Sequence, residues 1–466
     1  MLSREEYQSY DLIGLSELVN KGEVTPIEVV ETAIREIEAL NPDINAVVVS
    51  QFEIALDELK NRTDTPRFLG MPYLAKDLHA PVKGLPLANG SRVLKNQVFD
   101  FDSTTFARLR GAGFAILGRT NSPEFGLSAS TEPALWGPTR NPHNTACSAG
   151  GSSGGAGAAV ASGMMPAAHA TDSAGSIRIP AARCGLVGLK PTRGLNAFGP
   201  HRGDPVYGIS HEHAVTRSVR DSAAILDVTA GPDSGAPYFT QKPQEPFETL
   251  IQRPPSPLRI GFTHQSFIGT PVDAECKDAV LKTAKVLEDL GHNVEEAAPQ
   301  FDAGEMTDAM IRILMASLAS PFRMIENHLG RPISGDDVEP MTHSVLSFAK
   351  STSLADHLDR TVVLNTETRA LSKFFERYDV LLTPTLADPA LELGVLDTRK
   401  SDLDAFLDIL FTVSPFTAPF NVTGQPAMNM PLHQSKSGMP IGVQLIGRFG
   451  EDAGLLQLAH SLEVSS

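Results

Sequence analysis

One lysine and two serines, in three separate segments, have the residue types needed for nucleophilic catalysis. Lys76 lies at the end of the apolar segment 70–77 (GMPYLAKD), Ser152 lies in 150–155 (GGSSGG), and Ser176 lies in 171–180 (TDSAGSIRIP). A lysine in an apolar setting loses the solvation of its charge, so it can be neutral near pH 7 and act as a base. A serine needs such a base to become a nucleophile. The small residues before Ser176 would also let successive backbone N–H groups converge on one oxygen.

Each of these residues also has an ordinary explanation. Lys76 alone would be read as a surface cation, and either serine alone as part of a turn or a helix N-cap. Residues 151–155 (GSSGG) match G-x-S-x-G, the nucleophile elbow, with Ser153 as the reactive residue. That motif needs a strand directly before the serine, whereas the preceding NPHNTACSAG is typical of a turn. The elbow is therefore the weaker hypothesis.

The pattern His211-Glu212-His213 could indicate a metal site. A lone H-x-H has weak specificity, and a solvated or buried histidine pair explains it more simply. The sequence contains no G-x-G-x-x-G, Walker A or H-E-x-x-H motif. These patterns therefore give no strong signal of a metal or cofactor site.

The segment around the two serines is unusually rich in small residues. Residues 147–190 contain 9 Gly, 11 Ala and 6 Ser among 44 positions. A flexible linker is the simple alternative, but a linker would be polar, and this segment also carries apolar residues such as Val160, Met164, Ile177 and Leu189. Small residues mixed with apolar ones predict backbone packed closely against backbone or against a ligand.

The elements that must position these residues alternate between helix and strand. Thr25-Pro26-Ile27-Glu28 predicts a helix start with a capping box, and Asn41-Pro42 predicts its end. Residues 46–50 predict a buried strand, 105–112 a helix and 114–117 a further strand. This alternation indicates an α/β layered fold.

The second half of the chain continues the alternation after a break. Residues 232–257 are rich in proline and polar residues and predict a surface connection. The sequence then predicts a strand over 258–262, a helix over 274–290, a mostly helical stretch over 300–376, and strands over 380–386 and 441–446.

Composition excludes several classes of protein. The chain has 466 residues and a net charge of −16, which repels a phosphate backbone, so we expect no nucleic-acid partner. No apolar stretch reaches the length of a membrane span. The polar, acidic start MLSREEYQSY is not a secretory signal. The three cysteines form no C-x-x-C pair and no disulfide framework, so a cytoplasmic location is expected.

The motifs taken together resemble the amidase signature family. The resemblance is carried mainly by 150–194 (GGSSGGAGAAVASGMMPAAHATDSAGSIRIPAARCGLVGLKPTRG). Further matches are GRTN at 118–121, LTPT at 382–385, FNVTGQPA at 420–427 and GMPIGVQ at 438–444. It covers roughly 5–230 and 378–460, and leaves out the helical middle. It implies one domain over 1–466, with core motifs in 70–230 and 378–460, a mixed central sheet between layers of helices, and a variable, substrate-shaping region at about 300–376.

The resemblance also implies a role for each site residue. Lys76 corresponds to the basic lysine, Ser152 to a bridging serine that follows a non-proline cis peptide bond, and Ser176 to the nucleophile. The implied oxyanion hole is formed by backbone N–H groups of Ser176 and of the three residues before it: Ser173, Ala174 and Gly175. Supporting roles fall to Ser153, Asp172 and Arg178. The resemblance implies neither a metal ion nor an organic cofactor.

The sequence departs from the family pattern at several positions. The family commonly has Gly where Ala170 and Ala174 stand, and Ala tolerates a positive φ less well. The glutaminase subunits of transfer-RNA amidotransferases usually have a Ser-Ser-Leu-Asp-Gln stretch where this chain reads 208–213 (GISHEH). Within the family, the chain is most similar to the aminohexanoate cyclic dimer hydrolase branch.

These observations predict an amidase that hydrolyses neutral aryl, alkyl or cyclic amides through Lys76, Ser152 and Ser176. The apolar segment 310–324 (MIRILMASLASPFRM) would line part of the pocket, with ordinary core as its simpler explanation. The expected partner is a small-molecule amide, and a homodimer is possible. Two alternatives stay open: a glutamine amidase subunit of a transamidase complex, and an inactive protein that kept the fold.

Overall fold

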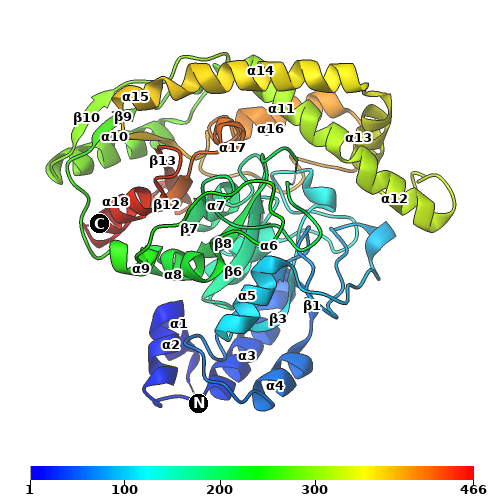
Figure 1. Cartoon of the computed structure of the whole chain (residues 1–466), viewed down its shortest axis with the longest axis vertical. Coiled ribbons are helices and arrows are strands. Elements are labelled where there is room, and N and C mark those ends of the chain that lie inside the picture. Colours follow the sequence, from blue (N-terminus) through cyan, green and yellow to red (C-terminus); the bar gives the residue numbers. More distant parts are fainter. Residues whose placement is uncertain (1, 205, 466) are drawn as a thin grey trace.

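The strands of the protein form two main sheets that meet edge to edge. A computed structural model describes residues 2–204 and 206–465 (Figure 1). The larger sheet has eight strands in the order β10-β9-β11-β13-β12-β7-β8-β6. Their bounds are Asn293–Glu296, Arg259–Phe262, Val380–Pro384, Pro440–Gly447, Ala427–Gln434, Val187–Lys190, His211–Thr216 and Ala167–Asp172. The smaller sheet has the order β1-β3-β2, with bounds Val47–Ser50, Ala115–Thr120 and Pro72–Lys76.

Both sheets are mixed, as the sequence predicts. Strands β9, β10 and β11 are parallel to one another, and β11 is antiparallel to β13. In the smaller sheet β2 is parallel to β3 and β1 is antiparallel to it. A short hairpin of β4 (Arg140–Asn141) and β5 (Asn144–Ser148) completes the strands described. The predicted α/β class with a mixed central sheet is confirmed.

Helices pack against the central strands of the larger sheet. Helix α7 (Arg178–Cys184) contacts β7, β12 and β13, and α10 (Ala274–Asp289) and α18 (Asp452–Ser465) also contact β13. The remaining helices of the sheet layers are α1 (Arg4–Ser9), α2 (Leu12–Asn20), α3 (Pro26–Ile44), α4 (Phe52–Lys60), α5 (Thr104–Ala112), α6 (Gly154–Ala161), α8 (Val219–Thr229), α9 (Phe247–Leu250) and α17 (Pro419–Thr423). Among the helices described, none combines the length and the apolar character that crossing a bilayer requires.

A group of helices lies at the end of the molecule opposite the N-terminus (Figure 1). It contains α11 (Ala303–Ser317), α12 (Ala319–Leu329), α13 (Pro340–Ser351), α14 (Leu354–Ser372), α15 (Phe374–Arg377) and α16 (Leu403–Val413). Helix α11 packs against both α13 and α14. The helical character predicted for 300–376 is therefore confirmed.

Helix α3 starts as predicted but ends later. Thr25 and Glu28 form both bonds of the capping box. The predicted end at Asn41-Pro42 is wrong, because the helix continues to Ile44 and ends at Asn45, which has φ 56°. Pro42 lies in the last turn, where its missing N–H removes one hydrogen bond and its fixed φ fits the helix. The Asn41 side chain then accepts hydrogen bonds from the backbone amides that follow the helix.

The small residues of 147–190 lie in regular, buried elements. The segment contains α6, β6, α7 and β7, and almost all of its residues are buried. A Cβ atom on Gly155 would come within 2.3 Å of the Asn121 amide nitrogen, and one on Gly154 within 2.4 Å of the Thr131 hydroxyl. The close backbone packing predicted from composition is confirmed, and a linker is excluded.

Candidate active site

Lys76 is buried at the end of β2 and contacts two hydroxyl groups. Its Nζ lies 2.7 Å from Ser152 Oγ and donates to Thr171 Oγ1 at 2.9 Å. The side chain is fully buried. Burial holds the pKa of Lys76 well below its ordinary value, and the carboxylate of Asp172 opposes this only partly. Burial therefore favours the form of the amine without its proton.

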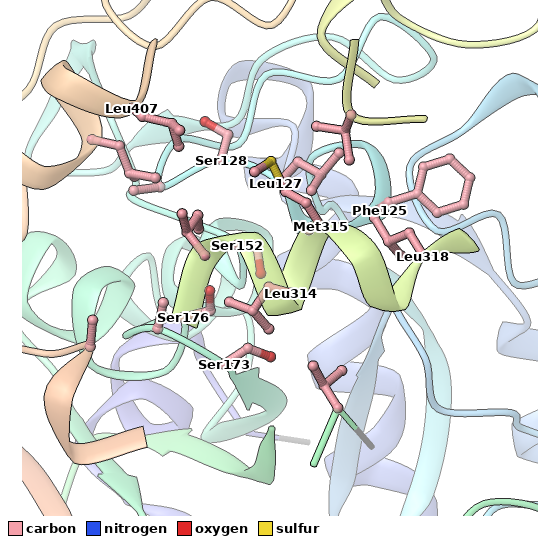
Figure 2. Close-up of a pocket in the computed structure, with 18 of the residues that line it drawn as sticks. Phe125, Leu127, Ser128, Ser152, Ser173, Ser176, Leu314, Met315, Leu318 and Leu407 are labelled. Carbon is pink, nitrogen blue, oxygen red and sulfur yellow. The ribbon is translucent and has the colours of Figure 1, made fainter. Parts of the chain in front are cut away.

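Ser152 and Ser176 line the same pocket (Figure 2). Ser152 follows a cis peptide bond from Gly151 and is 2% exposed. A side chain at Gly151 has no room, because its Cβ would lie 2.6 Å from the carbonyl oxygen of Ser128. Ser176 lies on the loop between β6 and α7 and is partly exposed. The structure thus brings Lys76 and Ser152 into contact and places Ser176 on the wall of the same cavity.

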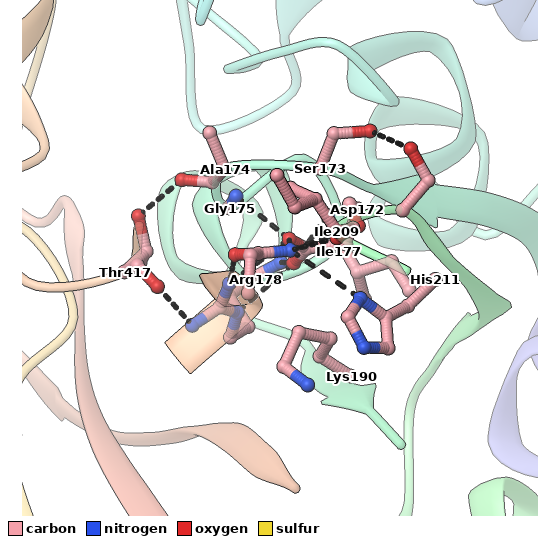
Figure 3. A network of polar contacts seen from close by, with 12 residues as sticks. Asp172, Ser173, Ala174, Gly175, Ile177, Arg178, Lys190, Ile209, His211 and Thr417 are labelled. Atoms are coloured by element: carbon pink, nitrogen blue, oxygen red, sulfur yellow. Dashed lines mark hydrogen bonds and ion pairs between the residues drawn. The ribbon is translucent and has the colours of Figure 1, made fainter. Parts of the chain in front are cut away.

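Asp172 holds the loop that carries Ser176 (Figure 3). Its carboxylate accepts hydrogen bonds from the amides of Gly175 at 2.7 Å and Ile177 at 3.2 Å. Arg178 donates to it from Nε and Nη2, both at 2.9 Å, and Asn421 donates from Nδ2 at 2.8 Å. Burial alone would raise the pKa of Asp172, but these donors and the Arg178 charge hold it far below its usual range. Asp172 is therefore a buried carboxylate that fixes the shape of the loop.

The bonding of this loop changes the expectation for Gly175. Its amide donates to Asp172, so it points away from the pocket in this structure. Its φ of 132° is in the region that favours glycine, and a Cβ there would lie 2.4 Å from the Thr417 hydroxyl. Ala174 is absent from the described non-glycine residues with positive φ, so alanine at this position carries no such strain. Within the described residues, the amides of Ala174 and Ser176 have no backbone acceptor.

Ser153, the nucleophile of the elbow hypothesis, faces the protein backbone. It is fully buried, its hydroxyl donates to the Thr171 carbonyl at 3.3 Å, and it accepts from the Thr171 amide at 3.3 Å. It is not among the described residues that line the pocket. Ser153 therefore ties the start of α6 to β6.

The two histidines of the H-x-H pattern each have a protein partner. His213 Nε2 lies 3.0 Å from the Ser222 hydroxyl, and His211 Nδ1 lies 3.5 Å from the Asn421 side-chain amide. Burial lowers the pKa of both rings, that of His213 to about 3. Glu212 between them lies 3.5 Å from His169, outside the described pocket lining. Across the described chain, no three His, Cys, Asp or Glu side chains are grouped to hold a metal ion.

The pocket above the two serines is apolar and without charged side chains. The space between its walls, including its opening to solvent, is about 1080 Å³. None of the described residues that line it is Asp, Glu, Lys or Arg. Its one histidine among them is His79, whose pKa burial and the nearby Arg202 and Lys76 hold well below the ordinary value. Such a pocket favours an uncharged ligand.

Part of the pocket wall comes from the helical segment predicted to contribute to it. Helix α11 lies across the two serines (Figure 2), and its residues Ile311, Leu314 and Met315 line the pocket, together with Leu318 directly after the helix. The other methionines of 310–324 point elsewhere: Met310 is buried in a separate core cluster and Met324 is 69% exposed.

Other wall residues were missed by sequence reasoning. Helix α16 contributes Leu403, Phe406, Leu407, Leu410 and Phe411, and the segment from Phe125 to Ala129 forms another wall. The helical spacing of the apolar residues in α16 was a usable signal for an amphipathic helix. Nothing in that spacing indicates which cavity the helix covers.

Comparison with known proteins agrees with this geometry. A family model described as Amidase matches residues 28–456. The 6-aminohexanoate-cyclic-dimer hydrolase of Paenarthrobacter ureafaciens is 38% identical, over 97% of this chain and 94% of its own. A solved 6-aminohexanoate cyclic dimer hydrolase complexed with substrate has a TM-score of 0.92 at 36% identity, over 98% of this chain and 97% of that one. A glutamyl-tRNA(Gln) amidotransferase chain from Thermotoga maritima is more distant, with a TM-score of 0.77 at 25% identity, over 100% and 95% of the two chains.

These matches test the family resemblance that the sequence motifs indicated. The family model spans most of the chain, and the hydrolase relative is well above 30% identity over nearly its whole length. The resemblance to the cyclic dimer hydrolase branch is confirmed. The chain therefore belongs to the amidase signature family, and it is a hydrolase of carbon–nitrogen bonds in amides.

Proposed function

We propose that the protein hydrolyses neutral amides through an acyl-enzyme on Ser176, with Ser152 and Lys76 as the proton relay. The observation that carries the proposal is the 2.7 Å contact between Lys76 Nζ and Ser152 Oγ beside the pocket that Ser176 lines. The lowered pKa of Lys76 supports its role as the base, because only the neutral amine can accept a proton.

The proposed reaction has two halves. In the first, Ser176 Oγ attacks the amide carbonyl while its proton passes to Ser152, whose own proton passes to Lys76. The C–N bond then breaks, and the leaving nitrogen receives a proton back through Ser152, which leaves an ester on Ser176. In the second, water attacks this ester by the same relay and releases a carboxylic acid and free Ser176.

The developing oxyanion would be held by backbone amides of the loop. The amides of Ser173, Ala174 and Ser176 are the proposed donors, because that of Gly175 is taken by Asp172. The Ser173 side chain is already paired with Ser210 at 2.6 Å, so only its amide is assigned a role. Preorganised donors of this kind account for a large share of catalysis in acyl transfer.

The proposed substrate is an uncharged aryl, alkyl or cyclic amide. The described lining of the pocket offers apolar walls and no carboxylate to a free α-amino group, which a glutaminase has to hold. Glu212 lies at His169 instead, which argues against its replacing such an anchor. The 6-aminohexanoate cyclic dimer, after which these relatives are named, is one substrate of the proposed class, and its two amides carry no charge.

The experiment that tests this proposal compares three substrates. We expect a measurable kcat/KM for 4-nitroacetanilide and for the 6-aminohexanoate cyclic dimer, and little ammonia from glutamine. A fluorophosphonate should label Ser176. A preference for glutamine, above all one that requires partner subunits, would support the transamidase alternative. Failure of all three together with an unlabelled Ser176 would support an inactive protein that kept the fold.

The cellular location belongs to the same proposal. The three cysteines, Cys147, Cys184 and Cys276, are all buried and free. Free thiols are the usual state in a reducing compartment, so they support a cytoplasmic enzyme.

A further inference from the structure

The main chain of Lys76 is held by side chains at the place where the two sheets meet. Strands β2 and β6 are end strands of their sheets and lie side by side. The next amide, that of Asp77, donates to the Thr120 carbonyl of β3 at 3.0 Å. The Lys76 amide instead donates to Nδ1 of His169 on β6 at 3.2 Å, and the Lys76 carbonyl accepts from Arg119 Nη1 at 2.9 Å.

The geometry defines which nitrogen of His169 carries a proton. A backbone amide is only a donor, so Nδ1 must be the unprotonated acceptor and the proton lies on Nε2. The Glu212 carboxylate oxygen Oε1 is 3.5 Å from Nε2. Both atoms are buried, and neither makes a hydrogen bond to a described residue, so this 3.5 Å approach is an electrostatic contact. Phe106 packs edge-on against the ring, with centroids 5.1 Å apart, and limits its rotation.

Strand β6 contacts both the main chain and the side-chain amine of Lys76. His169 and Thr171 are two positions apart on the strand, so their side chains lie on the same face. His169 accepts the Lys76 main-chain N–H, and Thr171 accepts from Nζ at 2.9 Å. Glu212 is the direct partner of Thr171 across the β6–β8 ladder. One end of the sheet thus sets both the Cα position and the Nζ position of the lysine.

We propose that His169, oriented by Glu212, is a positioning residue for Lys76 and sets the Nζ–Ser152 distance needed for proton transfer. The inference rests on the proposed function of Lys76 as the base. Neither His169 nor Glu212 is among the described residues that line the pocket, so they act through Lys76 and not on the substrate. A misplacement of about 1 Å at a relay group lowers a rate by about 100-fold.

Two substitutions of His169 test whether the ring acts through its hydrogen-bond acceptor or only through its volume. In His169→Asn the side-chain oxygen stands close to the place of Nδ1 and can accept the Lys76 N–H. In His169→Gln the polar atoms reach the place of Nε2, and the Lys76 N–H loses its acceptor. We expect His169→Gln to lower kcat for 4-nitroacetanilide roughly 10- to 100-fold at a KM within about twofold of wild type. We expect His169→Asn to keep kcat within roughly fivefold.

The rate of fluorophosphonate labelling of Ser176 gives a second readout, because it needs the relay but no amide substrate. We expect it to fall with kcat in His169→Gln and to recover in His169→Asn. Equal loss of kcat in both variants, or a wild-type kcat in His169→Gln, would overturn the inference. If His169→Gln does not fold, imidazole ¹⁵N shifts of the wild-type enzyme decide the matter, with His169 assigned by the signal that His169→Asn loses. A proton on Nε2 supports the inference and a proton on Nδ1 overturns it.

Lys76→Ala separates this inference from the proposed function. An active Lys76→Ala enzyme would overturn the relay itself, and the inference with it. An inactive Lys76→Ala enzyme beside a fully active His169→Gln enzyme would leave the relay intact and overturn only the role of His169.

Discussion

Replacing Asp172 by asparagine tests whether a buried charge holds the loop that carries Ser176. The two side chains have nearly the same shape, so the change removes the charge and little volume. The amide group of asparagine would also bring two N–H donors to a site already filled by the donors of Gly175, Arg178 and Asn421. One or more of these donors must then lose its acceptor.

The size of the effect follows from the burial of the pair. Both Asp172 and Arg178 have fully buried side chains, joined at 2.9 Å. Removing one partner leaves the other as a buried charge without compensation, which lowers the free energy of unfolding by about 3–5 kcal/mol. Activity should fall as well, because the Gly175 amide would be released and the orientation of the neighbouring oxyanion donors would be lost.

Urea unfolding of Asp172→Asn, Arg178→Met and the double variant measures this coupling. The double variant should be less destabilised than the sum of the two single variants, because it leaves no unpaired buried charge. Asp308→Asn is the matched control, because the side chains of its partner Arg312 and of Asp308 are 35% and 55% exposed, and we expect a change below about 1 kcal/mol. An Asp172→Asn enzyme as stable as this control, or additive effects in the double variant, would refute the reasoning.

The contribution of Asp172 and Arg178 to the free energy of unfolding should also depend on pH. Burial alone would raise the pKa of Asp172, but Arg178 and Asn421 lower it below its value in the unfolded chain. The stabilisation is therefore fully present above the unfolded pKa of about 3.9 and is lost as the pH falls through the folded pKa. The difference in stability between wild type and Asp172→Asn should be constant near neutral pH and shrink only in acid.

Three further predictions concern the reaction itself. Ser176→Ala should lower kcat by several orders of magnitude, because no acyl-enzyme can form; covalent labelling and turnover of 4-nitroacetanilide check this, and a nearly normal kcat would contradict it. Because burial lowers the pKa of Lys76, kcat/KM should rise with pH through one ionisation below that of an ordinary lysine, and Lys76→Arg should not restore a Lys76→Ala enzyme. Leu407→Asp places a charge in the apolar wall formed by α16 and should lower kcat/KM for neutral amides at least about tenfold, while Leu407→Met should not; equal values for the two variants would show that this wall does not contact substrate.

Local signals explain most of what the sequence predicted correctly. The capping box at Thr25 and Glu28 needs only residues three positions apart, and the structure has both of its bonds. The small residues of 147–190 indicated close packing. The structure shows why they are small: at Gly155, for example, Asn121 occupies the space that a side chain would need. The central motif was long enough to identify the family before any contact was known.

The features that the sequence did not predict depended on side-chain contacts that residue patterns do not indicate. Helix α3 continues past Pro42 to Ile44. The Asn41 side chain accepts hydrogen bonds from the amides of Ala46 and Val47, at the start of the next strand. The place of the Gly175 amide in the oxyanion hole stays a prediction. The hydrogen bond of this amide to Asp172 depends on a loop shape that Arg178 and Asn421 also hold, and no local pattern indicates that shape. The sequence did not show that α16 lines the pocket, because the opposite wall comes from the segment around Phe125, which lies far earlier in the chain.

On the proposed function, the uncharged pocket also affects what happens after cleavage. Hydrolysis converts a neutral amide into an amine and a carboxylic acid. Near neutral pH the acid is ionised, and an alkyl amine is protonated as well, whereas an aryl amine stays neutral. A pocket whose described lining has no Asp, Glu, Lys or Arg side chain gives these charges no ionic partner, and an unpaired charge in an apolar site is strongly unfavourable. The substrate is therefore bound more tightly than its products, which favours their release. For a cyclic diamide the consequence is sharper, since the opened product carries both charges on one molecule and should not return to the pocket for a second cleavage.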